Sequence, residues 1–264
     1  KNIINGTMRW STILTSRATL MLSYIAVLLL GQSAFAFWMP SRTAERRSSS
    51  FSLFYTPPHS IDASSIRYLG KGPNALVRPG VVLIAPISEV SHHLMRAAVF
   101  VYAMGFDEET NEEVIRGVVL DNPTPFTMHE MANVVTGKLG DKLLYRGGNY
   151  GKDSAILLHN VTDLQKEEIG KSGMYEGGLA NAVEGNFDVD RFKFFFNYCE
   201  FLPSELEKIL DEEVDPDTGD AWMSVEVPPE AVLHDWDKND CWKYLRKVVA
   251  TRFLSQSGKE GGDK

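Results

Sequence analysis

Apolar residues recur along most of the chain in short runs, and most of these runs have the length of a strand. β-branched and aromatic residues are frequent in them, and glycine or proline clusters separate several of them. A polar, acidic stretch over residues 105–113 predicts a loop between two neighbouring strands. We expect strands over residues 81–86, 98–102, 115–120, 143–145, 155–159, 192–198 and 222–227.

Three segments carry a helical pattern: residues 127–136, 204–213 and 241–254. The first two open on the spacing of a capping box, a serine or threonine three residues before a glutamate. The third places Trp242, Leu245, Val248, Val249 and Phe253 on one inward face. Because helices do not alternate one for one with strands, the pattern favours an α+β fold, with a mixed or antiparallel sheet and packed helices.

The N-terminal region has a different character. Counting from Met8, the first methionine, basic residues flank a largely apolar run over residues 18–30, and small residues follow, which predicts a signal peptide over residues 1–36. A membrane anchor is the alternative, but the run is shorter than the roughly 20 apolar residues that span a bilayer. Residues 37–75 begin rich in arginine and serine and continue rich in proline and glycine, which predicts a transit peptide and a linker.

This division leaves a single domain over residues 76–255 and a disordered tail over residues 256–264. The segment Ser33–Phe37 resembles the Ala-Phe cleavage motif that diatoms and related algae place between the signal and transit parts of plastid presequences. The resemblance implies delivery to the plastid stroma by the secretory route. Simple secretion is the alternative.

Charge and composition restrict the class of partner. The chain of 264 residues has a net charge of −8, but residues 1–60 hold six basic residues and one acidic residue. The remainder keeps 21 basic and 34 acidic residues, a net charge of −13. This balance opposes nucleic-acid binding. We expect a protein partner, and no association with a membrane after processing.

The candidate chemistry is sparse. Cys199 and Cys241 are too few for a disulfide framework, and two unrelated core thiols are favoured over a redox pair. Asp215, Asp217, Gly219 and Glu226 imitate part of a calcium loop, but the glycine of its sharp turn is missing, so a solvated acidic turn is favoured. No catalytic group, metal site or cofactor is predicted.

Polar residues and glycines at the ends of predicted strands form one candidate ligand site. It consists of Asp121, Asn122, Gly147, Gly148 and His159. His159 is a candidate general base or anion contact, and the alternative is a half-buried histidine that fixes a loop. The glycine pair superficially suggests a phosphate loop, but glycines at a hairpin explain it better, because the lysine-serine ending is missing.

Read in order, several segments resemble the AlgH/YqgE family. The segments are residues 80–86, 117–123, 145–148, 157–159 and 198–207, followed by Trp222, and the resemblance covers roughly residues 76–236. It implies an AlgH-like α+β domain. The chain departs from the family pattern at Asp121 and Asn122, which stand for Asn-Arg, and at Glu200, Leu202 and Ser204, which stand for three glycines.

The resemblance implies no established activity. Our first hypothesis is a non-enzymatic regulatory or protein-interaction module in the plastid, because no nucleophile, base and orienting group assemble. The alternative is a small-molecule-binding protein or enzyme that uses a site near Asp121, Gly147 and His159.

Overall fold

The computed structural model describes residues 61–107, 110–133, 135–164, 167–179, 182, 185, 187–212 and 218–254. The strands are β1 (Arg67–Lys71), β2 (Val82–Ile84), β3 (Ala98–Asp107), β4 (Glu112–Val119), β5 (Pro123–Thr127), β6 (Leu143–Arg146), β7 (Tyr150–His159), β8 (Tyr175–Glu176), β9 (Phe192–Phe201) and β10 (Met223–Glu226). The α-helices are α2 (Met128–Met131), α3 (Gly137–Gly140), α5 (Pro203–Glu212), α6 (Pro229–Leu233) and α7 (Asp240–Val249), and a π-helical turn (Ala250–Leu254) follows α7.

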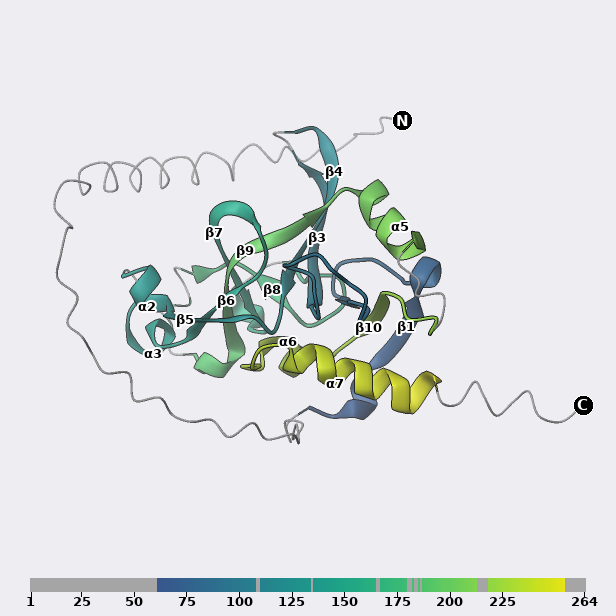
Figure 1. Ribbon diagram of the computed structural model, residues 1–264. Coiled ribbons are helices and arrows are strands. Elements are labelled where there is room, and N and C mark those ends of the chain that lie inside the picture. The colour runs from purple at the N-terminus through teal and green to yellow at the C-terminus, as the bar shows by residue number, and fades with distance from the viewer. Residues whose placement is uncertain are drawn as a thin grey trace, which may run out of the picture. The chain divides into compact units, whose positions relative to one another are not determined.

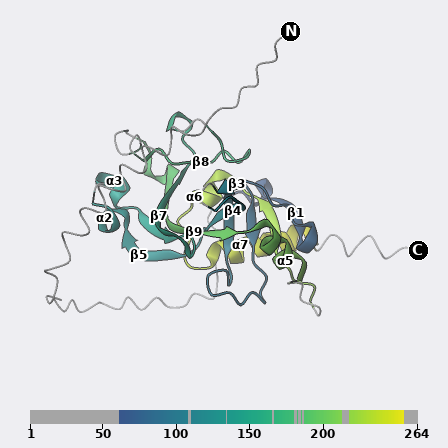
Figure 2. The same cartoon turned by 90° about the horizontal axis from the view of Figure 1, so that it is seen from above.

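The strands form a mixed sheet that is mostly antiparallel. Its order is β1-β10-β2-β3-β4-β9-β6-β5, with β7 paired to β9 and β8 paired to β7. Only the β6–β9 pairing is parallel among the described strands. Figure 1 shows α2 and α3 at one end of this sheet and α7 near β1 and β10 at the other, and Figure 2 shows the same separation from above. The predicted α+β class is confirmed.

Strand β9 joins the two halves of the sheet. Its first half lies between β6 and β7, and its second half pairs with β4 through Cys199, Glu200 and Phe201. Asn197 lies between the halves with φ of 62°, in the left-handed region that strands avoid. The strand therefore changes neighbours at an irregularity in its own backbone.

Helix α7 covers part of the larger apolar core. The helical spacing of its apolar residues puts Trp242, Leu245, Val248 and Val249 on the buried side, as predicted. The indole Nε1 of Trp242 donates to the carbonyl of Ala85 at 2.8 Å, which satisfies the polar atom of a buried ring. This contact fixes the start of α7 against the end of β2.

Several element predictions are confirmed with different bounds. The predicted strands correspond to β2, β3, β4, β6, β7, β9 and β10. The capping box at Thr127 is present, with Thr127 and Glu130 bonded to each other's backbone, but α2 ends at Met131 and α3 is a separate turn. At α5 the carboxylate of Glu205 accepts the Leu202 N–H at 3.3 Å, so the predicted Ser204–Glu207 box is wrong.

Two predicted loops contain strand residues. β3 and β4 pair as far as Asp107 and Glu112, inside the predicted loop over residues 105–113, because the hairpin extends its pairing into polar positions. β1 pairs with β10 inside the predicted linker, so the folded region starts before Leu76. The predicted signal peptide and the tail lie outside the described residues. No described helix is long and apolar enough to span a bilayer.

Candidate ligand-binding cleft

A cleft of about 460 Å³ lies where four segments meet. The segments are the turn before β3, the chain from the end of β4 into β5, the end of β6, and the residues before α7. The lining consists of His92, His93, Met95, Arg96, Ala97, Val119, Asp121, Asn122, Pro123, Thr124, Pro125, Phe126, Arg146, Gly148, Lys238 and Asn239. Three of the five predicted site residues, Asp121, Asn122 and Gly148, therefore lie in one cleft.

Asp121 is the buried acid of the cleft, with 1% of its surface exposed. Its Oδ2 accepts the Trp242 N–H at 2.9 Å, and its carbonyl accepts the Asn239 N–H at 3.1 Å, so the residue holds the start of α7. Its Oδ1 has no hydrogen-bond partner among the described residues. Burial raises the pKa of Asp121 to about 7, against smaller opposing effects of the Trp242 N–H, the Lys193 ammonium and the nearby backbone N–H groups of Ala98 and Asp121.

Three basic side chains line the same cleft. Arg96, Arg146 and Lys238 are exposed, and no carboxylate in the described part of the chain forms an ion pair with them. Arg146 is held by its backbone, because its N–H donates to the Asn122 carbonyl at 2.8 Å. The Arg146 Nε also donates to the Gly148 carbonyl at 3.4 Å. Guanidinium groups that lie beside a cleft without an ion pair can bind an anionic ligand.

The glycine pair has a structural reason. Because β6 and β7 lie on opposite sides of β9, the chain must cross β9 between them, and it does so at Gly147 and Gly148. A Cβ atom at Gly147 would lie 2.3 Å from the Asn197 carbonyl oxygen, and one at Gly148 would lie 2.1 Å from the Tyr198 carbonyl carbon. The predicted hairpin is wrong, since the two strands flank β9 instead of pairing with each other.

His159 is absent from the cleft lining. It is fully buried at the end of β7, where its ring stacks on Tyr175 at 5.7 Å between centroids. Its Nδ1 accepts the Val161 N–H at 3.1 Å, so the proton of the neutral ring is on Nε2. Burial lowers the pKa of His159. The structure thus places His159 in a packing role, apart from the other predicted site residues.

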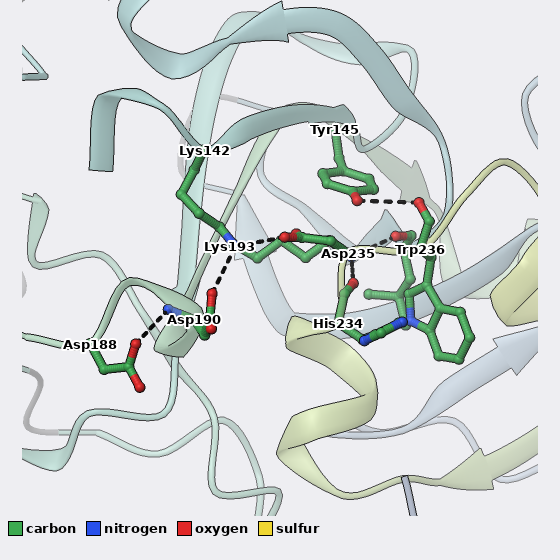
Figure 3. Close-up of polar contacts among 9 residues, drawn as sticks. Lys142, Tyr145, Asp188, Asp190, Lys193, His234, Asp235 and Trp236 are labelled. Carbon is green, nitrogen blue, oxygen red and sulfur yellow. Dashed lines mark hydrogen bonds and ion pairs between the residues drawn. The ribbon is translucent and has the colours of Figure 1, made fainter. Parts of the chain in front are cut away.

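Lys193 is a buried cation outside the lining of the cleft. Its ammonium donates to the carbonyls of Leu120, at 2.8 Å, and His234, and lies 3.9 Å from the centroid of the Tyr145 ring. Burial lowers the pKa of Lys193 to about 7. Figure 3 shows Lys193 beside His234, with Tyr145 above it. The Leu120 contact connects this lysine to the chain segment that carries Asp121.

Further ion pairs and a hydrogen bond fix the segment between α6 and α7. Lys142 lies between Asp235, at 2.8 Å, and Asp190, at 3.8 Å (Figure 3). The Tyr145 hydroxyl donates to the Trp236 carbonyl at 3.2 Å. Because this segment continues into Lys238 and Asn239, these contacts position one wall of the cleft.

The other candidate groups have structural partners. Cys199 and Cys241 are buried free thiols, and burial raises the pKa of Cys199 to about 12 and that of Cys241 well above its usual value. Glu226, one of the residues spaced like calcium ligands, forms ion pairs with Arg67 at 2.6 Å and with Arg78. Asp215 and Asp217 of the same pattern lie outside the described residues. Glu200, at a family glycine position, pairs with Arg116 at 2.7 Å.

The cationic residues of the site are the part that sequence reasoning missed. Arg96, Arg146 and Lys238 are far apart in the chain and have no shared spacing. Lys193 had a local signal, because it is the lone charge within the aromatic run from Phe192 to Phe196. A charged residue in a run that predicts a buried strand indicates a buried cation.

The fold and the cleft define a mixed α+β protein with a basic cleft beside its central strands. Residues 93–251 match the family described as AlgH-like, DUF179. The chain belongs to this family, for which no specific activity is shown.

Two solved structures are similar to the chain at 16% sequence identity. The solution structure of the AlgH protein from Pseudomonas aeruginosa matches over 70% of this chain and 95% of that chain, with a TM-score of 0.45. A crystal structure of a protein from Corynebacterium diphtheriae matches over 64% of this chain and 86% of that chain, also with a TM-score of 0.45. A comparison with curated proteins found no match.

Proposed function

We propose that the protein is a non-enzymatic regulatory module that binds a small molecule in the cleft at Asp121. The observation that carries the proposal is the combination of a cleft of about 460 Å³ with a buried carboxyl whose Oδ1 has no partner among the described residues. Concave sites with a few convergent polar groups are the usual form of ligand sites. An unsatisfied buried oxygen is costly unless a ligand or water satisfies it.

Binding without chemistry is favoured by the lining itself. Thr124 supplies the hydroxyl group of the lining, and its Oγ1 donates to the Leu144 carbonyl at 2.7 Å instead of to a histidine. A nucleophile activated by an adjacent base requires such a hydrogen bond. The site is therefore suited to hold a ligand.

The rim of the cleft supports a regulatory role. Met95 and Phe126 belong to the lining and are large apolar side chains that remain half exposed, and Ile87 and Val90 are exposed in the chain before Met95. Exposed apolar residues near a ligand site suit a protein partner that responds to the ligand. A pull-down from isolated plastids is expected to recover a stable partner, and recovery of none above background contradicts this part of the proposal.

The ligand is tested by a thermal-shift screen of the full chain against a metabolite library. We expect at least one compound to raise the melting temperature, and Asn122→Trp to abolish the shift because the indole fills the cleft. Asn74→Trp is the matched control, since Asn74 is exposed and outside the lining. The proposal is contradicted if no compound raises the melting temperature, or if the increase is the same in Asn122→Trp.

The plastid stroma is the proposed location, and the presequence pattern of residues 8–60 supports it. A fluorescent protein fused after residues 8–60 is expected to enter the plastid of a diatom. Fluorescence in the secreted fraction would favour secretion.

A further inference from the structure

The cleft is positive although the protein is acidic. The chain has a net charge of −8, yet the lining contributes Arg96, Arg146 and Lys238 against the single carboxyl of Asp121. Burial raises the pKa of that carboxyl to about 7, which reduces its negative charge near neutral pH. A cationic cleft in an anionic protein concentrates small anions locally, while the surrounding charge repels polyanions.

The three cations suit a phosphate group. They come from three separate segments that line the same cleft. A guanidinium offers parallel N–H donors that match two oxygens of one phosphate, and an ammonium adds a point charge. A phosphate dianion has three oxygens to share among these donors, whereas a carboxylate has two.

Asp121 requires a second feature of the ligand. Its Oδ1 is buried and without a partner among the described residues, while its Oδ2 is already bonded to Trp242. A carboxylate oxygen accepts hydrogen bonds and repels the oxygens of a phosphate. Near neutral pH, Oδ1 accepts a hydrogen bond when Asp121 is ionised and can donate one when it is protonated, so the group that lies over Asp121 should be able to do both, as a hydroxyl does.

We propose that the cleft binds a small organic phosphate that also carries hydroxyl groups, with Arg96, Arg146 and Lys238 at the phosphate and Asp121 at a hydroxyl. This inference rests on the proposed function and names the ligand class of the same site. Met95 and Phe126 provide apolar surface for the carbon skeleton of such a ligand.

The test is isothermal titration of the full chain with ribose 5-phosphate, inorganic phosphate, ribose and citrate. We expect ribose 5-phosphate to bind most tightly, inorganic phosphate more weakly and ribose not at all. The double variant Arg96→Gln/Arg146→Gln should weaken ribose 5-phosphate binding at least about tenfold, since one charge-assisted bond is worth roughly that factor. The control is Lys138→Gln/Lys247→Gln, which removes two exposed cations outside the lining.

Asp121→Asn tests the second contact. The amide oxygen still accepts the Trp242 N–H, but the amide nitrogen replaces the charged acceptor, so the hydrogen bond to a ligand hydroxyl loses its charge assistance. At pH 8, above the pKa of Asp121, the preference for ribose 5-phosphate over inorganic phosphate should fall roughly tenfold. Circular dichroism and the melting temperature check that this variant is folded. If it is unfolded, the preference of the unaltered chain for ribose 5-phosphate over inorganic phosphate decides the point.

Three results overturn the inference: no binding of ribose 5-phosphate at millimolar concentration, binding that the arginine variant leaves unchanged, or tighter binding of citrate. These failures are separate from failure of the proposed function. If the metabolite screen yields a ligand that Asn122→Trp excludes and ribose 5-phosphate does not bind, the cleft binds a different class of compound.

Discussion

Two buried ionisable residues are associated with the chain between β4 and β5: Asp121 belongs to it, and Lys193 donates to its Leu120 carbonyl. Asp121 lines the cleft and Lys193 does not, and burial moves both pKa values to about 7. Removing a charge from water is costly, and here the neighbouring dipoles and the Tyr145 ring offset only part of that cost. The protonation of both residues therefore affects the stability of the fold near neutral pH.

Asp121→Asn is expected to change how stability depends on pH. Between pH 4 and 7 the folded state keeps the Asp121 proton, whereas the unfolded state, with a pKa of 3.8, has released it. The free energy of unfolding contributed by Asp121 thus falls as pH rises toward 7, by at most about 1.4 kcal/mol per pH unit. Urea unfolding at pH 5.0 to 6.5, chosen as roughly the steepest part of this window, should show the variant gaining stability relative to the unaltered chain.

Lys193 also bears on this comparison, because the Asp121 charge raises the pKa of Lys193 and the substitution removes that charge; the resulting change in stability has the same sign. The pKa of Lys193 is lowered from 10.5, so its contribution changes above pH 7, with stability rising as pH rises. Burial lowers the pKa values of His93, His159 and His234, and their contributions are common to both proteins. Parallel stability profiles for the two proteins would show that Asp121 is ionised throughout.

At the scale of elements, the chain crossing at β9 shows what the local sequence pattern predicts and what only tertiary contacts decide. Runs of apolar residues predict β6, β7 and β9 correctly, because a buried strand consists largely of apolar residue types. The same runs do not tell which strands pair. The glycine pair between β6 and β7 suits a hairpin equally well, and only the position of β9 between the two strands excludes it.

Gly148→Ala should therefore be strongly destabilising. The new Cβ would lie 2.1 Å from the backbone carbon of Tyr198, and neither backbone can move without breaking the pairing of β9. We expect a loss of roughly 3 kcal/mol or more in the free energy of unfolding, measured in urea. Gly105→Ala is the control, because a Cβ at Gly105 meets no atom within 4 Å. Equal effects of the two substitutions would contradict the crossing.

At the scale of the whole molecule, the edge strand β1 extends the sheet into a segment that resembles a linker. Its register with β10 places Arg67 opposite Glu226, and their side chains form an ion pair at 2.6 Å. Ile66, just before β1, is 2% exposed and belongs to the main core. The segment contributes to the fold although proline and glycine flank it.

Ile66→Ala should destabilise the protein by about 2 to 4 kcal/mol, the usual cost of truncating a buried isoleucine. Ile87→Ala should change stability by less than about 0.5 kcal/mol, because Ile87 is 66% exposed. Chemical denaturation of both variants measures the difference. A neutral result for Ile66→Ala would restore the linker interpretation.

The amino-acid sequence alone determined the strands β2, β3, β4, β6, β7, β9 and β10, the helices α2, α5 and α7, the capping box at Thr127, the inward face of α7 and the α+β class. Each depends on residues close together in the chain, whose spacing records burial directly. Asp121, Asn122 and Gly148 were also predictable as candidate site residues, because they follow strand ends.

Only the tertiary structure decided that β9 divides its pairing between the two halves of the sheet, that His159 lies outside the cleft, and that Arg96, Arg146 and Lys238 gather beside Asp121. These features depend on which distant segments pair and pack, and the spacing of residues within one segment carries no record of that choice. The family resemblance indicated the fold, while the charges that define the cleft became visible only when four separate segments were placed together.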